Sequence, residues 1–197
     1  MTTHDVEPGR VLSERRRREL LDRLVQVFLA QGFTAFSVED LALRCHCSTA
    51  TLLAVAPDRA QLERTVLAHF FTGTEQTLEV RIAAIPDAGL RPGEYLAGVA
   101  AALAPASNAF FRDLERCAAG RQLYEASTRR AAARVRELLR DGVRAGRLRD
   151  VQASFVGDTV SAVTARISSG AVLLSTGLDD ARAYSELATL VTVGVSA

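Results

Sequence analysis

The sequence predicts an all-α protein in which a small three-helix, helix-turn-helix domain is joined by a long helix to a larger helical bundle. Apolar residues recur at helical spacing and not in alternation. Ala and Leu are abundant, whereas β-branched residues are scattered. Ser, Asp, Gly and Pro stand where helices should begin and end. The chain of 197 residues is long enough for a small domain beside a larger one.

The composition restricts the class of protein. Hydrophobic residues make up 48% of the chain and charged residues 24%, as in globular proteins. The net charge of +1 means that nucleic-acid binding would need a local basic surface. Arg166 interrupts the longest apolar stretch, residues 156–174, and the N-terminus is polar, so we expect a cytoplasmic protein without a membrane segment.

The first two helices have clear boundaries. Leu20, Leu24 and Phe28 recur at helical spacing within residues 13–31, and Gly32 follows as a C-cap. The segment SVED at residues 37–40 reads as a capping box that opens a short helix through residue 45.

A turn and two further helices follow. Ser48 is placed to cap a helix over residues 49–55, which Pro57 ends. Asp58, with Gln61 reaching back, opens a fourth helix that continues to about residue 82. We therefore predict a domain at residues 1–57, with a flexible arm at about 1–12, and a second domain at residues 58–197.

Pro and Gly punctuate the rest of the chain at regular intervals. They predict four or five more helices, with the spans 92–103, 108–119, 121–145, 153–176 and 179–195.

The short helices suit presentation of one helix end to a DNA major groove. Leu41 and Leu52 can pack against the first helix, which leaves Thr49, Ala50 and Leu53 pointing outward. Small residues at this face would let the helix enter the groove deeply.

Four segments in order, GFT (32–34), FSVEDLA (36–42), STATL (48–52) and DRAQL (58–62), resemble the tetracycline-repressor (TetR) family over about the first seventy residues. The chain departs from the family pattern at Leu53, where a Tyr is usual, and at His46, where a Gly is usual. The resemblance implies phosphate contacts from some side chains and base contacts from Thr49 and Ala50. The expected DNA-binding residues are Thr34, Ser37, Arg44, Ser48, Thr49, Ala50, Thr51, Leu53 and Arg59, with phosphate roles for Thr34, Ser37, Thr51 and Arg59.

The basic run at residues 15–18 offers a further DNA contact. Four consecutive residues point to all sides of a helix, so only one or two can face one partner. We assign this contact to Arg15 and Arg18; the alternative is a solvated face paired with Glu14, Glu19 and Asp22.

The larger domain is expected to bind an effector and to dimerise. By the resemblance, a small and largely apolar effector would lie against aromatic residues, although an aromatic residue at helical spacing is more often plain core. The candidate pocket residues are Phe70, Phe71, Tyr95, Phe110, Phe111, Cys117 and Tyr124. The expected homodimer interface, on the last two predicted helices, comprises Val156, Val160, Val163, Ile167, Leu187, Leu190 and Val191.

The sequence thus predicts a ligand-responsive transcriptional repressor that binds double-stranded DNA at a pseudo-palindrome as a homodimer. The alternative is a helical sensor or protein-interaction module whose degenerate helix-turn-helix no longer binds DNA. No Gly-rich phosphate loop, GxSxG or HExxH motif occurs, so we expect neither an enzyme nor a cofactor. Cys45, His46 and Cys47 lack a second ligand cluster, and we expect no metal.

Overall fold

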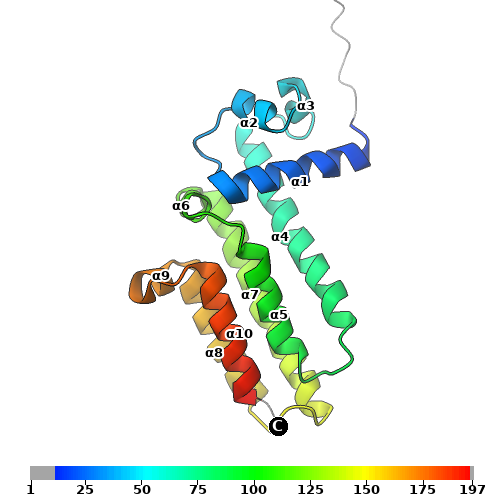
Figure 1. Ribbon diagram of the computed structural model, residues 1–197, viewed down its shortest axis with the longest axis vertical. Coiled ribbons are helices and arrows are strands. Elements are labelled where there is room, and N and C mark those ends of the chain that lie inside the picture. The colour runs from blue at the N-terminus through cyan, green and yellow to red at the C-terminus, as the bar shows by residue number, and fades with distance from the viewer. Residues whose placement is uncertain (1–11, 196–197) are drawn as a thin grey trace, which may run out of the picture. The chain divides into compact units, whose positions relative to one another are not determined.

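The computed structural model describes residues 12–195, which form helices and loops without a β-strand (Figure 1). The predicted all-α class is confirmed. The helices are α1 (Glu14–Gln31), α2 (Val38–Arg44), α3 (Thr49–Leu53), α4 (Arg59–Ala83), α5 (Arg91–Leu103), α6 (Asn108–Arg116), α7 (Ala118–Arg144), α8 (Ala153–Ser168), α9 (Ala171–Thr176) and α10 (Asp180–Val195). The arm expected at about residues 1–12 lies, apart from Leu12, outside the described residues.

The chain divides into two compact units. Unit 1 comprises Met1–Phe70 and Ser107–Asp113, and unit 2 comprises Phe71–Ala106 and Leu114–Ala197. Unit 1 is larger than the predicted domain 1–57, because it includes the first turns of α4, with buried Leu62. Unit 1 also includes the first part of α6. No local sequence pattern indicates that this segment belongs with the N-terminal helices.

Side-chain caps fix the helix ends in unit 1. The Ser13 hydroxyl accepts a hydrogen bond from the Arg16 amide at the start of α1, and Gly32, at φ 77°, ends that helix. Ser37 and Asp40 form the predicted capping box of α2, each side chain accepting the other's backbone N–H. Local chemistry alone therefore explains these boundaries.

Unit 2 is built around a closed ring of four helices. Helix α5 packs against α10, α10 against α8, α8 against α7, and α7 against α5, with α9 attached to α8 and α10 (Figure 1). Buried apolar side chains fill the ring; they include Leu96, Leu103, Val135, Leu139, Val160, Ile167, Leu187 and Val191.

The part of α4 within unit 2 is joined to α7 by two ion pairs. Arg130 pairs with Glu75 at 2.7 Å, and Arg134 pairs with Glu79 at 2.8 Å. The pairs lie four residues apart on each helix, one turn apart, so they hold the two helices in a single register.

Two predicted boundaries are wrong. Gly120 was expected to separate two helices, but the break lies at Cys117, whose thiol accepts a hydrogen bond from the Gly120 amide as the N-cap of α7. The helix predicted over 153–176 is divided at Gly170, which adopts φ 71° and separates α8 from α9. A left-handed residue cannot continue a right-handed helix.

Candidate nucleic-acid interface

Helices α2 and α3 form the predicted helix-turn-helix in unit 1. Leu41 and Leu52 are completely buried, as is Leu24 of α1, so the three helices share one core. In the connecting turn the Cys47 amide donates to the Ala42 carbonyl at 3.0 Å. His46 adopts φ 52°, the left-handed conformation that a Gly would occupy at lower free-energy cost.

Small and apolar side chains form the outward face of this motif. Ala50 and Leu53 of α3 are exposed, Leu53 by 46%, whereas Thr49 is half-buried. Leu43 of α2 is 73% exposed. A face of this kind can contact thymine methyl groups but offers no bidentate hydrogen-bonding group to a base.

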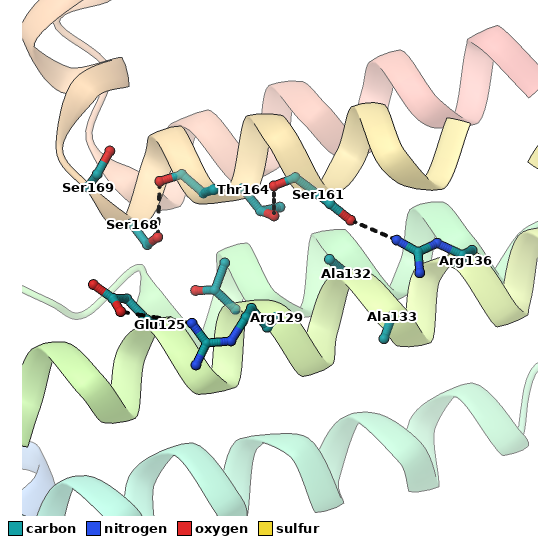
Figure 2. A pocket seen from close by; sticks show the side chains of 11 residues that line it. Glu125, Arg129, Ala132, Ala133, Arg136, Ser161, Thr164, Ser168 and Ser169 are labelled. Carbon is teal, nitrogen blue, oxygen red and sulfur yellow. Dashed lines mark hydrogen bonds and ion pairs between the residues drawn. The ribbon is translucent and has the colours of Figure 1, made fainter. Parts of the chain in front are cut away.

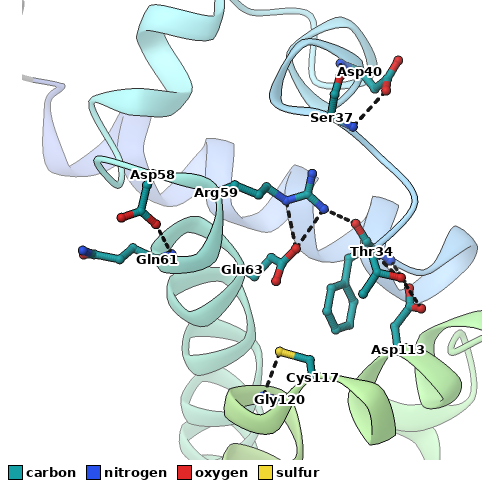
Figure 3. Close-up of polar contacts among 11 residues, drawn as sticks. Thr34, Ser37, Asp40, Asp58, Arg59, Gln61, Glu63, Asp113, Cys117 and Gly120 are labelled. Atoms are coloured by element: carbon teal, nitrogen blue, oxygen red, sulfur yellow. Dashed lines mark hydrogen bonds and ion pairs between the residues drawn. The ribbon is translucent and has the colours of Figure 1, made fainter.

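Several predicted phosphate-binding side chains already serve the fold (Figure 3). The Thr34 hydroxyl donates to Asp113 at 2.6 Å, and Ser37 caps α2. Ser48 caps α3, and its hydroxyl lies 2.8 Å from that of Thr51. Their DNA contacts remain predictions, and any such contact would have to share these hydrogen bonds.

Arg59 is also engaged within unit 1. Its guanidinium donates to the Phe33 carbonyl and pairs with Glu63 at 2.9 Å (Figure 3). Burial raises the pKa of Glu63, and the neighbouring Arg59 charge opposes this effect. The side chain of Arg59 is only 25% exposed, which makes it a less available phosphate ligand than the sequence suggested.

Asp113 holds the loop before α2 in place, and nothing in the sequence pointed to this role. Its carboxylate accepts hydrogen bonds from the backbone amides of Phe33 and Thr34 at 2.6 and 2.9 Å, in addition to the Thr34 hydroxyl. These contacts fix the loop that leads into α2. The partners are about eighty residues apart in the chain, so no local motif could indicate them.

The arginines of α1 divide between structural and exposed positions. Arg17 donates to the Val55 carbonyl at 3.0 Å, and Arg23 donates to the Cys45 carbonyl at 3.2 Å, so both tie α1 to the motif. Arg15 pairs with Glu19 at 2.8 Å, in agreement with the paired-face alternative, while Arg18 is exposed. Arg44 of α2 lies 4.2 Å from the centre of the Phe36 ring, a cation–π contact.

No protein-family model matches the sequence. No curated protein matches it significantly. Solved structures do match: one, described as a transcriptional regulator from Saccharomonospora viridis in complex with choline, is 16% identical, with a TM-score of 0.70 over 94% of this chain and 100% of that one. A TetR-family regulator from Rhodococcus sp. is 18% identical, with a TM-score of 0.64 over 91% of this chain and 98% of that one. The chain has the fold of TetR-family regulators.

A third structure with the same TetR fold is a transcriptional regulator, FadR, from Bacillus subtilis in complex with stearoyl-CoA. It is 12% identical, with a TM-score of 0.61 over 89% of this chain and 97% of that one. These identities establish a shared fold. The choline and stearoyl-CoA complexes concern those proteins, and their ligands differ greatly in size and polarity.

The candidate pocket residues of the TetR-like fold fall into both units. In unit 1, Phe110 makes edge contacts with Phe70 and Phe111 at 6.2 and 5.6 Å between ring centres. In unit 2, Phe71 stacks on Tyr124 at 5.7 Å, Tyr95 is buried, and Cys117 is the cap of α7. Each aromatic contact accounts for these residues as core, so a pocket role for them remains a prediction.

The expected dimer-interface residues differ in their exposure within one chain. Val160, Ile167, Leu187 and Val191 are at least 94% buried inside unit 2. Val156 and Val163 are half-buried, and Leu190 is 68% exposed. The apolar side chains that do point outward on α8 and α10 are Phe155, Leu190 and Val193, exposed by 72%, 68% and 73%.

Three expectations from the sequence concern the thiols of Cys45 and Cys47, a bound metal and a membrane segment. Burial raises the pKa of the Cys45 thiol to about 11, and burial also raises the pKa of Cys47, so both remain protonated at neutral pH. Across residues 12–195, no group of three or more His, Cys, Asp or Glu could hold a metal ion. Within that range, no helix combines the length and apolar character needed to cross a bilayer.

Proposed function

We propose that this chain is a one-component, ligand-responsive transcriptional regulator, acting as a repressor, that binds double-stranded DNA as a homodimer. The observation that carries the proposal is the α2–turn–α3 motif: its core is formed by Leu41 and Leu52, while Ala50 and Leu53 remain exposed. The likeness of the whole chain to structures of regulators supports it. The proposed role involves no catalysis.

Dimerisation would occur through the outer faces of α8 and α10. Phe155, Leu190 and Val193 expose apolar surface there, and such surface is unfavourable in contact with water. A two-fold symmetric pair would present two copies of α3 to successive major grooves, about 34 to 36 Å apart. The bound DNA site would therefore be a pseudo-palindrome.

The alternative is a protein-interaction module that has lost DNA binding. Leu43 and Leu53 favour it, because both expose apolar surface, 73% and 46%, on the face that would otherwise meet DNA. The proposal of a DNA-binding regulator accounts for more of the structure than the alternative does, because the caps, buried core and turn of the helix-turn-helix are all present.

Selection of genomic DNA fragments by the purified full chain, followed by sequencing, separates the two functions. We expect enrichment of fragments that share an inverted repeat. Ala50→Glu should abolish enrichment, because it places a negative charge against the phosphates and fills the small surface of α3. Ala101→Glu, at an exposed Ala of α5, is the matched control and should retain it. Recovery of no fragment above background would favour the interaction module.

A further inference from the structure

A cavity of about 410 Å³ lies between α7 and α8 in unit 2 (Figure 2). Cavities of this size accommodate small-molecule ligands. Its lining contains two arginines, one glutamate and five hydroxyl side chains, and none of the aromatic residues expected at an effector site. The charged and hydroxyl residues are Glu125, Arg129, Arg136, Thr128, Ser161, Thr164, Ser168 and Ser169.

Arg136 provides a positioned positive charge at one end. Its guanidinium donates to the Ser161 hydroxyl at 3.2 Å, and within residues 12–195 it has no carboxylate partner within ion-pair distance. The aliphatic stem packs against Gly157 of α8, where an added Cβ would lie only 2.7 Å from the Arg136 Cγ. Gly157 thus makes room for Arg136 at the cavity wall.

The hydroxyl groups along α8 are arranged as acceptors. Thr164 donates its proton to the Ser161 carbonyl at 3.1 Å, Ser168 to that of Ala165 and Ser169 to that of Arg166, both at 3.2 Å. A hydroxyl has a single proton, so the remaining lone pairs of these oxygens are available to hydrogen-bond donors on a ligand.

The end opposite Arg136 carries one charge of each sign, Glu125 and Arg129. Figure 2 places Arg136 and Ser161 at one end of the cavity and Glu125, Ser168 and Ser169 at the other. Glu125 is 3.9 Å from Arg129, a long contact, and both side chains are substantially exposed. The cavity therefore offers a cation without a carboxylate partner, Arg136, at one end. Hydrogen-bond acceptors lie along its wall and at its other end, where Glu125 is loosely paired with Arg129.

Thr128 adds a buried polar group to the lining. Among the described residues its hydroxyl forms no hydrogen bond of ordinary geometry. It does lie close to the Tyr184 phenol, whose pKa burial raises and this contact lowers. A ligand with a donor or acceptor at this point would complete its hydrogen bonding.

We infer that this cavity binds a small carboxylate that also carries hydroxyl or amino groups, with the carboxylate on Arg136 and the donor groups toward the hydroxyls and Glu125. This inference deepens the proposed function by giving the chemical class of the effector. It differs from the expectation of a largely apolar effector, because eight of the eleven lining residues carry a charge or a hydroxyl group, although carbon atoms form most of the wall. Its exposed rim residues, such as Ala133 and Ala165, leave a route from solvent.

Calorimetric titration of the full-length chain without DNA tests the inference. The probes are gluconate, citrate, L-serine and L-glutamate; sorbitol lacks the carboxylate and octanoate lacks the donor groups. We expect saturable binding of at least one probe and at least about tenfold weaker binding of sorbitol and octanoate. Binding of none of the four probes, or equal binding of sorbitol or octanoate, would overturn the inference.

Variants locate the binding at this cavity. Arg136→Met keeps the stem against Gly157 and removes the guanidinium, so it should weaken binding about tenfold or more. Gly157→Ala retains the guanidinium but displaces it, so this variant should weaken binding as well. It tests the site independently in case Arg136→Met is unstable. Arg140→Met, at an exposed arginine of α7 outside the cavity lining, is the matched control and should change affinity less than about threefold. Unchanged binding in Arg136→Met and Gly157→Ala would refute the site. Because DNA is absent, that failure would leave the proposed function standing.

Discussion

Asp180 supplies the sharpest test of the energetics in unit 2. It is the first residue of α10, is only 7% exposed, and accepts a hydrogen bond from the Tyr124 phenol. Burial raises the pKa of this carboxyl from 3.8 to about 6; the Tyr124 hydrogen bond acts against the increase, and the charges of Asp179 and Glu115 add to it.

The direction of the pH dependence follows from this pKa. Between about pH 4 and pH 6 the folded chain holds the Asp180 proton more strongly than the unfolded chain does, so raising the pH through this window lowers the free energy of unfolding. The difference between 3.8 and about 6 corresponds to about 3 kcal/mol, with the full loss present above pH 6.

Asp180→Asn removes the titration while its amide oxygen can still accept from Tyr124. Urea denaturation of both proteins from pH 4 to pH 7.5 should show the variant gaining about 2.5 kcal/mol relative to the wild type across the series, because a small part of the loss is already present at pH 4. A pH-independent difference in unfolding free energy between the two proteins does not affect this comparison. The other titrating groups are the same in both proteins, so their contributions cancel. Asp158→Asn, at an exposed carboxylate of α8, is the control and should run parallel to the wild type. Parallel curves for Asp180→Asn as well would refute the reasoning.

Four further outcomes are expected. Asp113→Ala should cost about 2 to 4 kcal/mol in urea denaturation and speed hydrogen exchange at the Phe33 amide, since it removes three hydrogen bonds; normal stability would contradict the assigned role. His46→Gly should raise the unfolding free energy by about 1 kcal/mol by relieving the left-handed backbone at φ 52°, and a loss of stability would count against that conformation. Replacing thymine by deoxyuridine in a selected DNA site should weaken binding about fourfold per methyl group contacted by the apolar face of α3, as measured by fluorescence anisotropy; equal affinity would exclude methyl contacts. Val193→Glu should give a monomer in sedimentation, whereas Val80→Glu, at a Val of α4 exposed to almost the same extent, 74% against 73%, should not; a dimeric Val193→Glu would move the interface elsewhere.

The sequence predicted features that depend on neighbouring residues. Ser13, Ser37 and Ser48 mark helix starts because each side chain bonds to an amide three residues later, and Gly32 ends α1 for the same local reason. The turn position of His46 was also predictable from the family pattern.

Features that depend on distant contacts were not predictable. The apolar residues of α8 and α10 occupy more than one side of each helix, so their spacing alone could not tell the inward Val160 from the outward Phe155. The cavity likewise depends on the pairing of α7 with α8. The tethers made by Arg17 and Arg23 end on backbone carbonyls, which leave no trace in side-chain patterns.

The carboxylate of Asp113 has a consequence for biosynthesis. A ribosome completes α1, α2 and α3 well before it reaches Ser107–Asp113, the segment that finishes unit 1. Until that segment emerges, the amides of Phe33 and Thr34 lack their acceptor, and the loop into α2 is not held in place. The helix-turn-helix motif is thus encoded first but matures late, after half of the chain has been translated.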